Sequence, residues 1–293
     1  MPFSGPQIRG MDKAIKKVCD TIIQYTKAPD ARPPIVRCVV RLKDMVAVIT
    51  GGASGMGRST ALLFAREGAS VVVGDVDATA GEALVAEAAA SNLPIAFQRT
   101  DVSVEADMAN LIATAERKHG RLDTIFNNAG IEQPVTASDA VSAELFERVI
   151  DINLKGTFFG CKHAIPALLR NGGGTIVNNS SVSAFANVGG NLSYAASKGG
   201  IMSMTRVIAI EYAARNIRCN AINPGVIDTG MNRRNLDLAV DPDALEEKWR
   251  SITPLGRMGT GDEIGEAVLF LASGQSSFVT GIGLVIDGGR IAT

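Results

Sequence analysis

Histidine and cysteine are scarce in this chain, and their scarcity limits the chemistry that it can carry. Only two histidines occur among the 293 residues, His119 and His163, and neither has a partner at the spacing of a metal ligand. A histidine-based metal site or a Ser-His-Asp hydrolase is therefore not expected, because both need a histidine in a defined role. The four cysteines are scattered and lack the close pairing of a zinc or redox motif. A large chain with so few cysteines is typical of a reduced, cytoplasmic protein.

The sequence also lacks an excess of one charge and any long apolar run. Lys and Arg number 29 against 30 Asp and Glu, which gives a formal net charge of −1. Proteins that bind nucleic acid usually carry a strong basic excess, so no nucleic-acid partner is expected. A bilayer-spanning helix needs about 20 apolar residues in a row, and no run approaches that length. With 46% hydrophobic residues, the chain is predicted to be soluble, with a sizeable core and no membrane partner.

What the chain does contain is a regular alternation of short apolar runs and longer amphipathic segments from Asp44 onward. Near-continuous Val and Ile runs indicate strands buried on both faces, as in a parallel sheet covered by helices. The alternation predicts an α/β protein with a Rossmann-type, doubly wound, seven-stranded parallel sheet in a single domain. The expected strands are 45–50, 70–75, 95–99, 124–127, 175–178, 217–222 and 283–286.

Residues 1–40 are predicted to form an extension before a larger domain at 41–293. Apolar residues recur at helical spacing from Met11 to Tyr25 and predict a short amphipathic helix, which a proline-rich linker follows. A basic excess leaves organelle targeting open, although serine is scarce and two acids lie within the segment. The alternatives are a helix packed on the body or on a neighbouring subunit, a misplaced start, or a disordered stretch.

A glycine-rich turn joins the first predicted strand to the first helix and reads Thr50-Gly51-Gly52-Ala53-Ser54-Gly55-Met56-Gly57. Phosphate binding at a helix N-terminus needs backbone N–H donors at close range, and side chains would obstruct that approach. The first, fifth and seventh residues after Thr50 are glycines spaced to supply the tight turn, the close approach and the strand–helix contact. A triphosphatase loop is the competing interpretation, but Arg58 occupies the position where that loop needs a lysine.

Asp75 ends the second predicted strand and indicates which dinucleotide the turn would hold. An acid at this place can accept hydrogen bonds from the adenosine ribose hydroxyls and repels a 2′-phosphate. Ser54 precedes Gly55, where a basic residue would be needed to pair with such a phosphate. The pattern favours NAD over NADP. A strand-end acid exposed to solvent is the alternative interpretation of Asp75 alone.

Tyr194 and Lys198 are four residues apart, which places them on the same face of a helix. A cation close to a phenol stabilises the phenolate, so the pKa of Tyr194 is expected to fall below its usual value of about 10. The phenol can then protonate an alkoxide, or accept the proton of an alcohol, while hydride moves to or from a nicotinamide. The pair follows a strand that ends at Ser180 and Ser181.

Taken together, residues 42–290 resemble a short-chain dehydrogenase/reductase of the single-domain type. The match includes Asn127-Asn128-Ala129-Gly130 after the fourth strand and Asp287-Gly288-Gly289 near the end. The resemblance implies a catalytic set of Tyr194, Lys198, Ser181 as donor to the substrate oxygen, and Asn153 as holder of a water in the proton relay. It implies cofactor contacts from Gly51, Ser54, Gly55, Met56, Gly57, Asp75, Asp101, Val102, Asn128, Ala129, Gly130, Tyr194, Lys198, Pro224, Gly225, Ile227 and Thr229.

Simpler roles stay open for three of these residues. Ser180 could carry the functional hydroxyl in place of Ser181, although its side chain should alternate away from the site. Asn153 could merely bond the backbone of its own helix. Asn128 is interpreted as a structural bridge between strands, with Ala129 and Gly130 lining the cofactor through their backbone.

The resemblance also implies a lid over the substrate at 228–254, and places Glu132 and Ser183 in the substrate pocket. A carboxylate there would repel an acidic substrate and accept a bond from a hydroxyl, which favours a neutral small-molecule alcohol or ketone, such as a cyclic ketone or a diol. Members of the family commonly pair through the helices near 151–170 and 194–214, so a homotetramer is expected. The competing functions are an NAD-binding scaffold or sensor without useful turnover, and epimerisation or dehydration on the same fold.

Overall fold

The computed structural model describes residues 40–187 and 189–292. Contacts divide the chain into two units, Met1–Val40 and Arg41–Thr293, and every element below belongs to the second unit. The amphipathic helix predicted before residue 40 lies outside the described residues.

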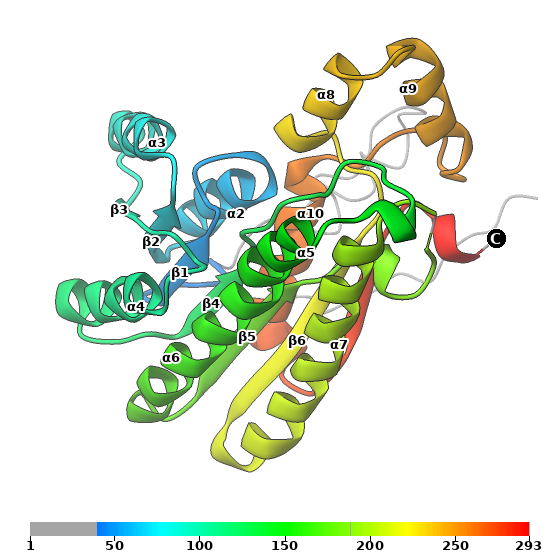
Figure 1. Cartoon of the computed structure of the whole chain (residues 1–293). Coiled ribbons are helices and arrows are strands. Elements are labelled where there is room, and N and C mark those ends of the chain that lie inside the picture. Colours follow the sequence, from blue (N-terminus) through cyan, green and yellow to red (C-terminus); the bar gives the residue numbers. More distant parts are fainter. Residues whose placement is uncertain (1–39, 188, 293) are drawn as a thin grey trace, which may run out of the picture. The chain divides into compact units, whose positions relative to one another are not determined.

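Seven parallel strands form one sheet in the order β3-β2-β1-β4-β5-β6-β7 (Figure 1). The order reverses between β1 and β4, where two crossovers leave in opposite directions and create a crevice at the carboxyl ends. This topology confirms the predicted Rossmann-type, doubly wound fold. The strands are β1 (Val46–Thr50), β2 (Ser70–Asp75), β3 (Ile95–Arg99), β4 (Thr124–Asn127), β5 (Gly174–Asn179), β6 (Ile217–Pro224) and β7 (Gly283–Ile286).

Helices cover both faces of the sheet, and for this reason the strands read as near-continuous apolar runs. In β1, Ala47 and Ile49 belong to a core cluster with α2, α3 and α10, whereas Val46 and Val48 belong to a second cluster with α4, α6 and α7. Alternate side chains thus enter opposite cores. The helices are α2 (Gly55–Arg66), α3 (Ala78–Ala90), α4 (Glu105–His119), α5 (Ala143–Val149), α6 (Gly156–Arg170), α7 (Leu192–Tyr212), α8 (Gly230–Asp237), α9 (Pro242–Ser251) and α10 (Gly261–Ala272).

Short helical turns complete the fold. A π-helical segment at Ile150–Lys155 runs directly into α6. The 3₁₀ turns are Ser138–Ala140, Val182–Ala184, Ala213–Arg215, Gly274–Ser276 and Arg290–Ala292. None of the helices between residues 40 and 292 combines the length and the apolarity of a membrane span.

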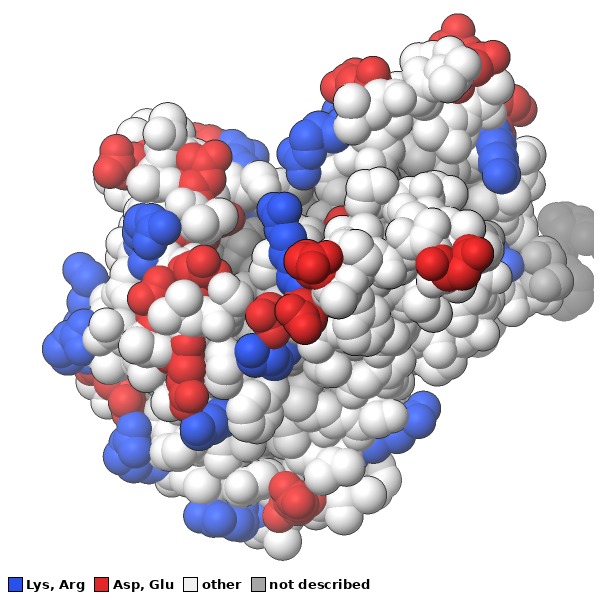
Figure 2. All heavy atoms as spheres, viewed as in Figure 1, with Lys and Arg blue, Asp and Glu red and all other residues white. Residues whose placement is uncertain are grey.

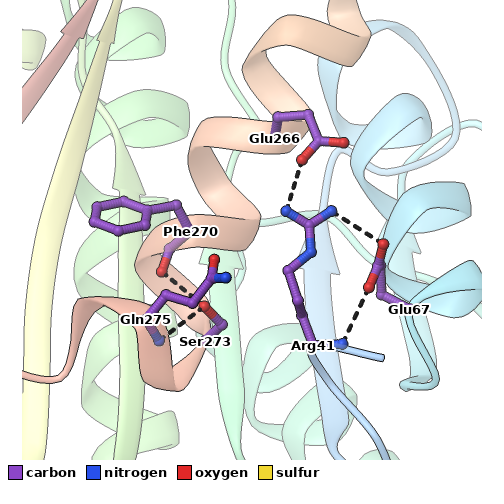
Figure 3. A network of polar contacts seen from close by, with 6 residues as sticks. All are labelled: Arg41, Glu67, Glu266, Phe270, Ser273 and Gln275. Atoms are coloured by element: carbon purple, nitrogen blue, oxygen red, sulfur yellow. Dashed lines mark hydrogen bonds and ion pairs between the residues drawn. The ribbon is translucent and has the colours of Figure 1, made fainter. Parts of the chain in front are cut away.

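Arg41 joins the end of α2 to α10 (Figure 3). Its guanidinium donates to Glu67 Oε1 at 3.0 Å and to Glu266 Oε2 at 2.8 Å, and its backbone N–H donates to Glu67 Oε2 at 3.0 Å. The hydrogen bond with Glu67 contributes most to raising the pKa of Arg41 above its usual value. The C-terminal end of α2 is therefore tied to the middle of α10.

Candidate active site

A cleft of about 850 Å³ lies at the carboxyl ends of the central strands, where the sheet order reverses. Figure 2 shows a hollow between α3 and the α8–α9 segment, with acidic and basic side chains on its rim. Clefts of this volume hold ligands of cofactor size. The predicted residues that line it are Gly51, Ser54, Gly55, Met56, Asp75, Asp101, Val102, Asn128, Ala129, Gly130, Tyr194, Lys198 and Thr229.

At three positions the glycine turn suits only glycine: Gly51 and Gly55 have a positive φ, and Gly57 packs closely against Gly51. Gly51 has a φ of +61°, and a Cβ there would lie 2.8 Å from the Cα of Ala129. A Cβ on Gly57 would lie 2.2 Å from the carbonyl oxygen of Gly51, so a side chain there would push the helix away from the strand. The turn is therefore held close to the strand ends, as phosphate binding by backbone N–H groups requires.

The N-terminus of α2 has the features of an anion-binding site. Ser54 is its N-cap residue and, within the described chain, its side chain makes no capping hydrogen bond. The first turn of α2 also contains no acidic residue. The first N–H groups of a helix have no intrahelical partner and carry the positive end of its dipole. The uncapped helix start, the glycine backbone and the size of the cleft fit a dinucleotide.

Asp75 and Asp101 lie in the cleft at the ends of neighbouring strands. Asp75 Oδ2 accepts from Ala53 N–H at 3.0 Å, so this carboxylate braces the glycine turn. Asp101 Oδ1 accepts from the N–H and the hydroxyl of Ser103 at 3.0 and 2.7 Å. Both carboxylates are thus held in place and face the cavity.

Asn128 bridges the two central strands. Its Nδ2 donates to the carbonyls of Thr50 and Gly51, each at 3.0 Å, and its own N–H donates to Thr50 Oγ1 at 3.0 Å. Ala129 N–H donates to the same hydroxyl at 3.1 Å. These contacts agree with the structural role predicted for Asn128, and they fix the backbone of 128–130 along the cleft.

Tyr194 and Lys198 lie on one face of α7, with the Lys198 Nζ 5.4 Å from the centre of the Tyr194 ring. Nζ donates to the carbonyl of Asn179 at 2.7 Å. Burial lowers the pKa of Lys198 to about 8, and the charge of Glu132 opposes that shift. The two side chains predicted to share one face of the helix therefore both line the cleft.

The predicted lowering of the Tyr194 pKa is wrong for the protein on its own. Burial of the phenol, and then the negative charge of Glu132, raise the pKa of Tyr194 above its usual value. A hydrogen bond with the side chain of Ser181 acts in the opposite direction. The i and i+4 spacing placed the cation correctly, but it carried no information about desolvation, which disfavours the charged phenolate.

The two serines at the end of β5 have different partners. The Ser180 hydroxyl donates to the carbonyl of Lys198 at 3.0 Å and is buried against α7. The Ser181 hydroxyl lies beside Tyr194 and accepts from Ser183 N–H at 3.1 Å. This arrangement favours Ser181 over Ser180 as the functional hydroxyl. Ser183 contributes its backbone N–H to that contact.

Asn153 is fully buried in the π-helical segment, and its side chain is completely engaged. Oδ1 accepts from Ile131 N–H at 2.8 Å, and Nδ2 donates to Ile131 O at 2.9 Å and to Ser197 Oγ at 3.1 Å. The simpler interpretation was that the side chain bonds the backbone of its own helix. It instead bonds the backbone of Ile131 and the hydroxyl of Ser197, which belong to other segments.

A second cavity of about 350 Å³ adjoins the cleft. Glu132 lines it, and its Oε2 accepts from Asn235 Nδ2 of α8 at 2.6 Å. This contact ties the predicted lid segment to the loop after β4. The residues common to both cavities are Gly130, Ile131, Arg148, Met231 and Arg234.

Several other predicted site residues line neither of these cavities. Pro224 ends β6, Gly225 N–H donates to the carbonyl of Ile286 at 2.9 Å, and Ile227 is buried. Neither of the two cavities is lined by these three residues or by Gly57, Asn153, Ser181 or Ser183. Within the described residues, no group of three or more His, Cys, Asp or Glu side chains could hold a metal ion.

Sequence reasoning missed two residues that support the site. Asn179 ends β5 and lines the cleft, where its carbonyl accepts from Lys198. Gln133 is buried and its side chain contacts the first turn of α7. The only sequence signal for Gln133 was a polar residue shortly after Asn127-Asn128-Ala129-Gly130, and its partners lie about 60 residues away.

Comparison with known proteins agrees with this geometry. The family described as Enoyl-(Acyl carrier protein) reductase matches residues 51–290. The chain is 38% identical over 252 residues to 3-oxoacyl-(acyl-carrier-protein) reductase FabG of Thermotoga maritima, covering 86% of this chain and 100% of that protein. It is 36% identical over 248 residues to cyclohexanol dehydrogenase of an Acinetobacter species, covering 85% and 95%. The crystal structure of levodione reductase superimposes with a TM-score of 0.84 at 36% identity, covering 86% and 100%.

The chain therefore belongs to the short-chain dehydrogenase/reductase family, as its motifs predicted. It is an oxidoreductase by this membership, and the family binds nicotinamide cofactors.

Proposed function

We propose that this protein is an NAD-dependent oxidoreductase that interconverts a secondary alcohol and a ketone, with 41–293 as its catalytic domain. The observation that carries the proposal is the position of Tyr194 and Lys198 in the cleft that begins at the glycine turn, with the Ser181 hydroxyl beside Tyr194. The fold alone would not distinguish a reaction, but an acid/base pair beside a dinucleotide cleft does.

Each side chain of the set has a distinct task. When bound, the nicotinamide supplies the hydride that reduces the carbonyl carbon, or accepts it from the alcohol. Tyr194 donates its phenolic proton to the carbonyl oxygen, or accepts the hydroxyl proton in the reverse direction. Ser181 donates a hydrogen bond to the same oxygen. Lys198, with a pKa of about 8, is mostly cationic at neutral pH and stabilises the phenolate as it forms.

Asn153 completes the proposed set as the residue that holds a water in the proton relay. Its side chain is already bonded to Ile131 and Ser197, so the backbone carbonyl is the group left for that water. This carbonyl accepts from Thr157 Oγ1 at 2.7 Å, and a carbonyl oxygen can accept a second hydrogen bond.

The preference for NAD rests on Asp75. Its carboxylate lines the cleft beyond the glycine turn, where a free adenosine ribose can donate hydrogen bonds and a 2′-phosphate would be repelled. Ser54 provides no positive charge to offset that repulsion. Most of the other proposed cofactor contacts line the cleft, from Gly55 to Thr229, whereas Gly57, Pro224, Gly225 and Ile227 do not.

The proposed substrate is a neutral cyclic ketone or the corresponding alcohol or diol. Glu132 lines the second cavity together with apolar Ile131, Leu145 and Met231. Arg148 and Arg234 line it too, so an apolar wall and charges of both signs face the same space. The Glu132 carboxylate can accept a hydrogen bond from a substrate hydroxyl. Two of the relatives are named for cyclohexanol and levodione, which supports a substrate of this class.

A cytoplasmic homotetramer is the proposed assembly. Val207 and Ile210 on α7 and Phe158 on α6 are exposed apolar side chains on the helices expected to pair, with Ile210 81% exposed. Symmetric pairing of such faces would bury them. Sedimentation of the purified protein at several concentrations tests this: a mass near that of one chain contradicts it.

The test of the proposed function follows reduced-nicotinamide absorbance while cyclic alcohols and ketones are screened with NAD and NADP, using wild type and Tyr194→Phe. We expect turnover with NAD and a fall of about 10³-fold or more in kcat for Tyr194→Phe, because the proton donor is lost. Binding of NAD by both proteins, measured by fluorescence, controls for folding. Cofactor binding without turnover on any member of the panel would contradict the proposal in favour of a scaffold or sensor.

A further inference from the structure

We infer that Gln133 is a positioning residue for Tyr194, because its side chain fixes the first turn of α7 and thereby the location of the Tyr194 hydroxyl in the cleft. The inference rests on the proposed function of Tyr194 as acid/base. Gln133 itself lines neither of the two cavities, so it acts through the helix.

Both ends of the Gln133 amide are engaged. Oε1 accepts from Ser193 N–H at 2.7 Å and, at a longer 3.4 Å, from Tyr194 N–H. Nε2 donates to the carbonyl of Gly190 at 3.0 Å. The side chain is only 7% exposed, so water does not readily replace these bonds. Gln133 therefore holds the chain immediately before α7 and the first N–H groups within it.

The start of α7 needs such a contact. The first N–H groups of a helix lack intrahelical acceptors, and an N-cap side chain usually supplies one. Asn191 is the N-cap of α7, but within the described chain its side chain makes no capping hydrogen bond. Gln133, some 60 residues earlier, supplies the missing acceptor from the loop after β4. Tyr194 lies in this first turn, so its position depends directly on the cap.

The loop that carries Gln133 is itself anchored. Asn153 holds the neighbouring Ile131 through both its N–H and its carbonyl, at 2.8 and 2.9 Å. The next residue, Glu132, accepts from Asn235 of α8. Three consecutive residues thus connect the π-helical segment, the lid helix and the start of α7. Such support holds an acid/base group at the distance that proton transfer needs.

Displacement of the phenol by about 1 Å can lower the rate of a positioned reaction about 100-fold. We therefore expect Gln133→Met, which keeps the size of the side chain and removes both polar ends, to lower kcat by about 10- to 100-fold. The dissociation constant of NAD should change by less than about twofold, because the glycine turn and Asp75 are untouched.

Gln133→Glu provides the rescue. Its carboxylate still accepts from the N–H groups at the start of α7 and is favoured there by the helix dipole, although the donor to Gly190 is lost. Most of the kcat should return, and the alkaline limb of the pH profile should move to higher pH, because a nearby anion raises the pKa of a phenol. Gln275→Met makes the same change at an exposed residue next to α10 and should leave kcat unchanged (Figure 3).

Amide hydrogen exchange gives a readout that does not depend on turnover. The Ser193 and Tyr194 amides should exchange at least about tenfold faster in Gln133→Met than in Gln275→Met, because their acceptor is gone. Unchanged exchange overturns the inference whether or not the wild type is active. Faster exchange with kcat within twofold of wild type overturns it too, since a merely structural cap would behave in that way. Absence of wild-type turnover would instead contradict the proposed function.

Discussion

The buried ammonium of Lys198 should destabilise the folded protein near neutral pH, so we expect Lys198→Met to be the more stable protein there. The side chain is 2% exposed and its Nζ has the Asn179 carbonyl as a hydrogen-bond partner at 2.7 Å. A cation placed in such surroundings loses its hydration, and one neutral acceptor does not replace it fully.

The size of the effect follows from the pKa. Burial lowers the pKa of Lys198 from 10.5 to about 8. At 1.36 kcal/mol per pKa unit, this shift destabilises the folded state by ~3 kcal/mol when Lys198 is charged, which is the case below pH 8. Removing Nζ also leaves the Asn179 carbonyl without this donor, at ~1–3 kcal/mol. The net gain in the free energy of unfolding for Lys198→Met is therefore ~0–2 kcal/mol at pH 7.

The sign of the pH dependence is fixed by the same shift. The unfolded chain binds this proton up to pH 10.5 and the folded chain only to about pH 8. The free energy of unfolding of the wild type therefore rises between pH 8 and pH 10.5. The stability difference in favour of Lys198→Met becomes smaller over this range and then changes sign. Tyr194 is present in both proteins, so to first order the pH dependence from its raised pKa cancels in the difference.

Urea unfolding of the cofactor-free wild type and Lys198→Met at pH 7 and pH 9.5 measures this difference. Lys118→Met, at an exposed lysine of α4, is the control and should change stability by less than ~0.5 kcal/mol. A Lys198→Met protein that is less stable at pH 7, or a difference that does not change with pH, would refute the reasoning.

Three further changes probe the cleft. Glu132→Gln removes the negative charge that raises the pKa of Tyr194 and Lys198, so the alkaline limb of kcat/KM should move to lower pH; a shift to higher pH contradicts this. Gly57→Ala places a Cβ 2.2 Å from Gly51 O and should weaken NAD binding at least about tenfold in a fluorescence titration, whereas Gly274→Ala, with open space around it, should not. Asp75→Asn retains an acceptor for Ala53 N–H and should narrow the NAD over NADP ratio of kcat/KM by about tenfold or more, and an unchanged ratio would argue against Asp75 as the discriminating residue.

The sequence predicted the fold well because most of the inner strands are buried on both faces and form short apolar runs. The expected bounds of β2, β3, β4 and β7 match the structure. β2 and β4 are buried inside the sheet, whereas β3 and β7 are its partly buried edge strands. β6 extends two residues further than expected, through Asn223 and Pro224, which pair with β7. A polar residue and a proline gave no local signal of that pairing.

The sequence predicted those site residues that form a local pattern, but not those whose role depends on contacts with residues far away in the chain. The glycine turn and the Tyr194–Lys198 pair were found from local patterns. The capping role of Gln133 depends on partners that only the folded chain brings near. The direction of the Tyr194 pKa shift depends on burial and on Glu132, neither of which a helical spacing reveals.

Because Ile150–Lys155 is π-helical, the number of residues in this segment determines where Asn153 and the residues of α6 point. A π turn is an α-helix with one residue inserted, and each residue of an α-helix turns the next by about 100°. Asn153 must face Ile131, while Cys161, Ala164 and Leu168 of α6 must face the core. The inserted residue lets both demands hold in one continuous helix. Any engineered or natural variant that shortens this stretch by one residue would have to give up either the anchor of the loop or the packing of α6.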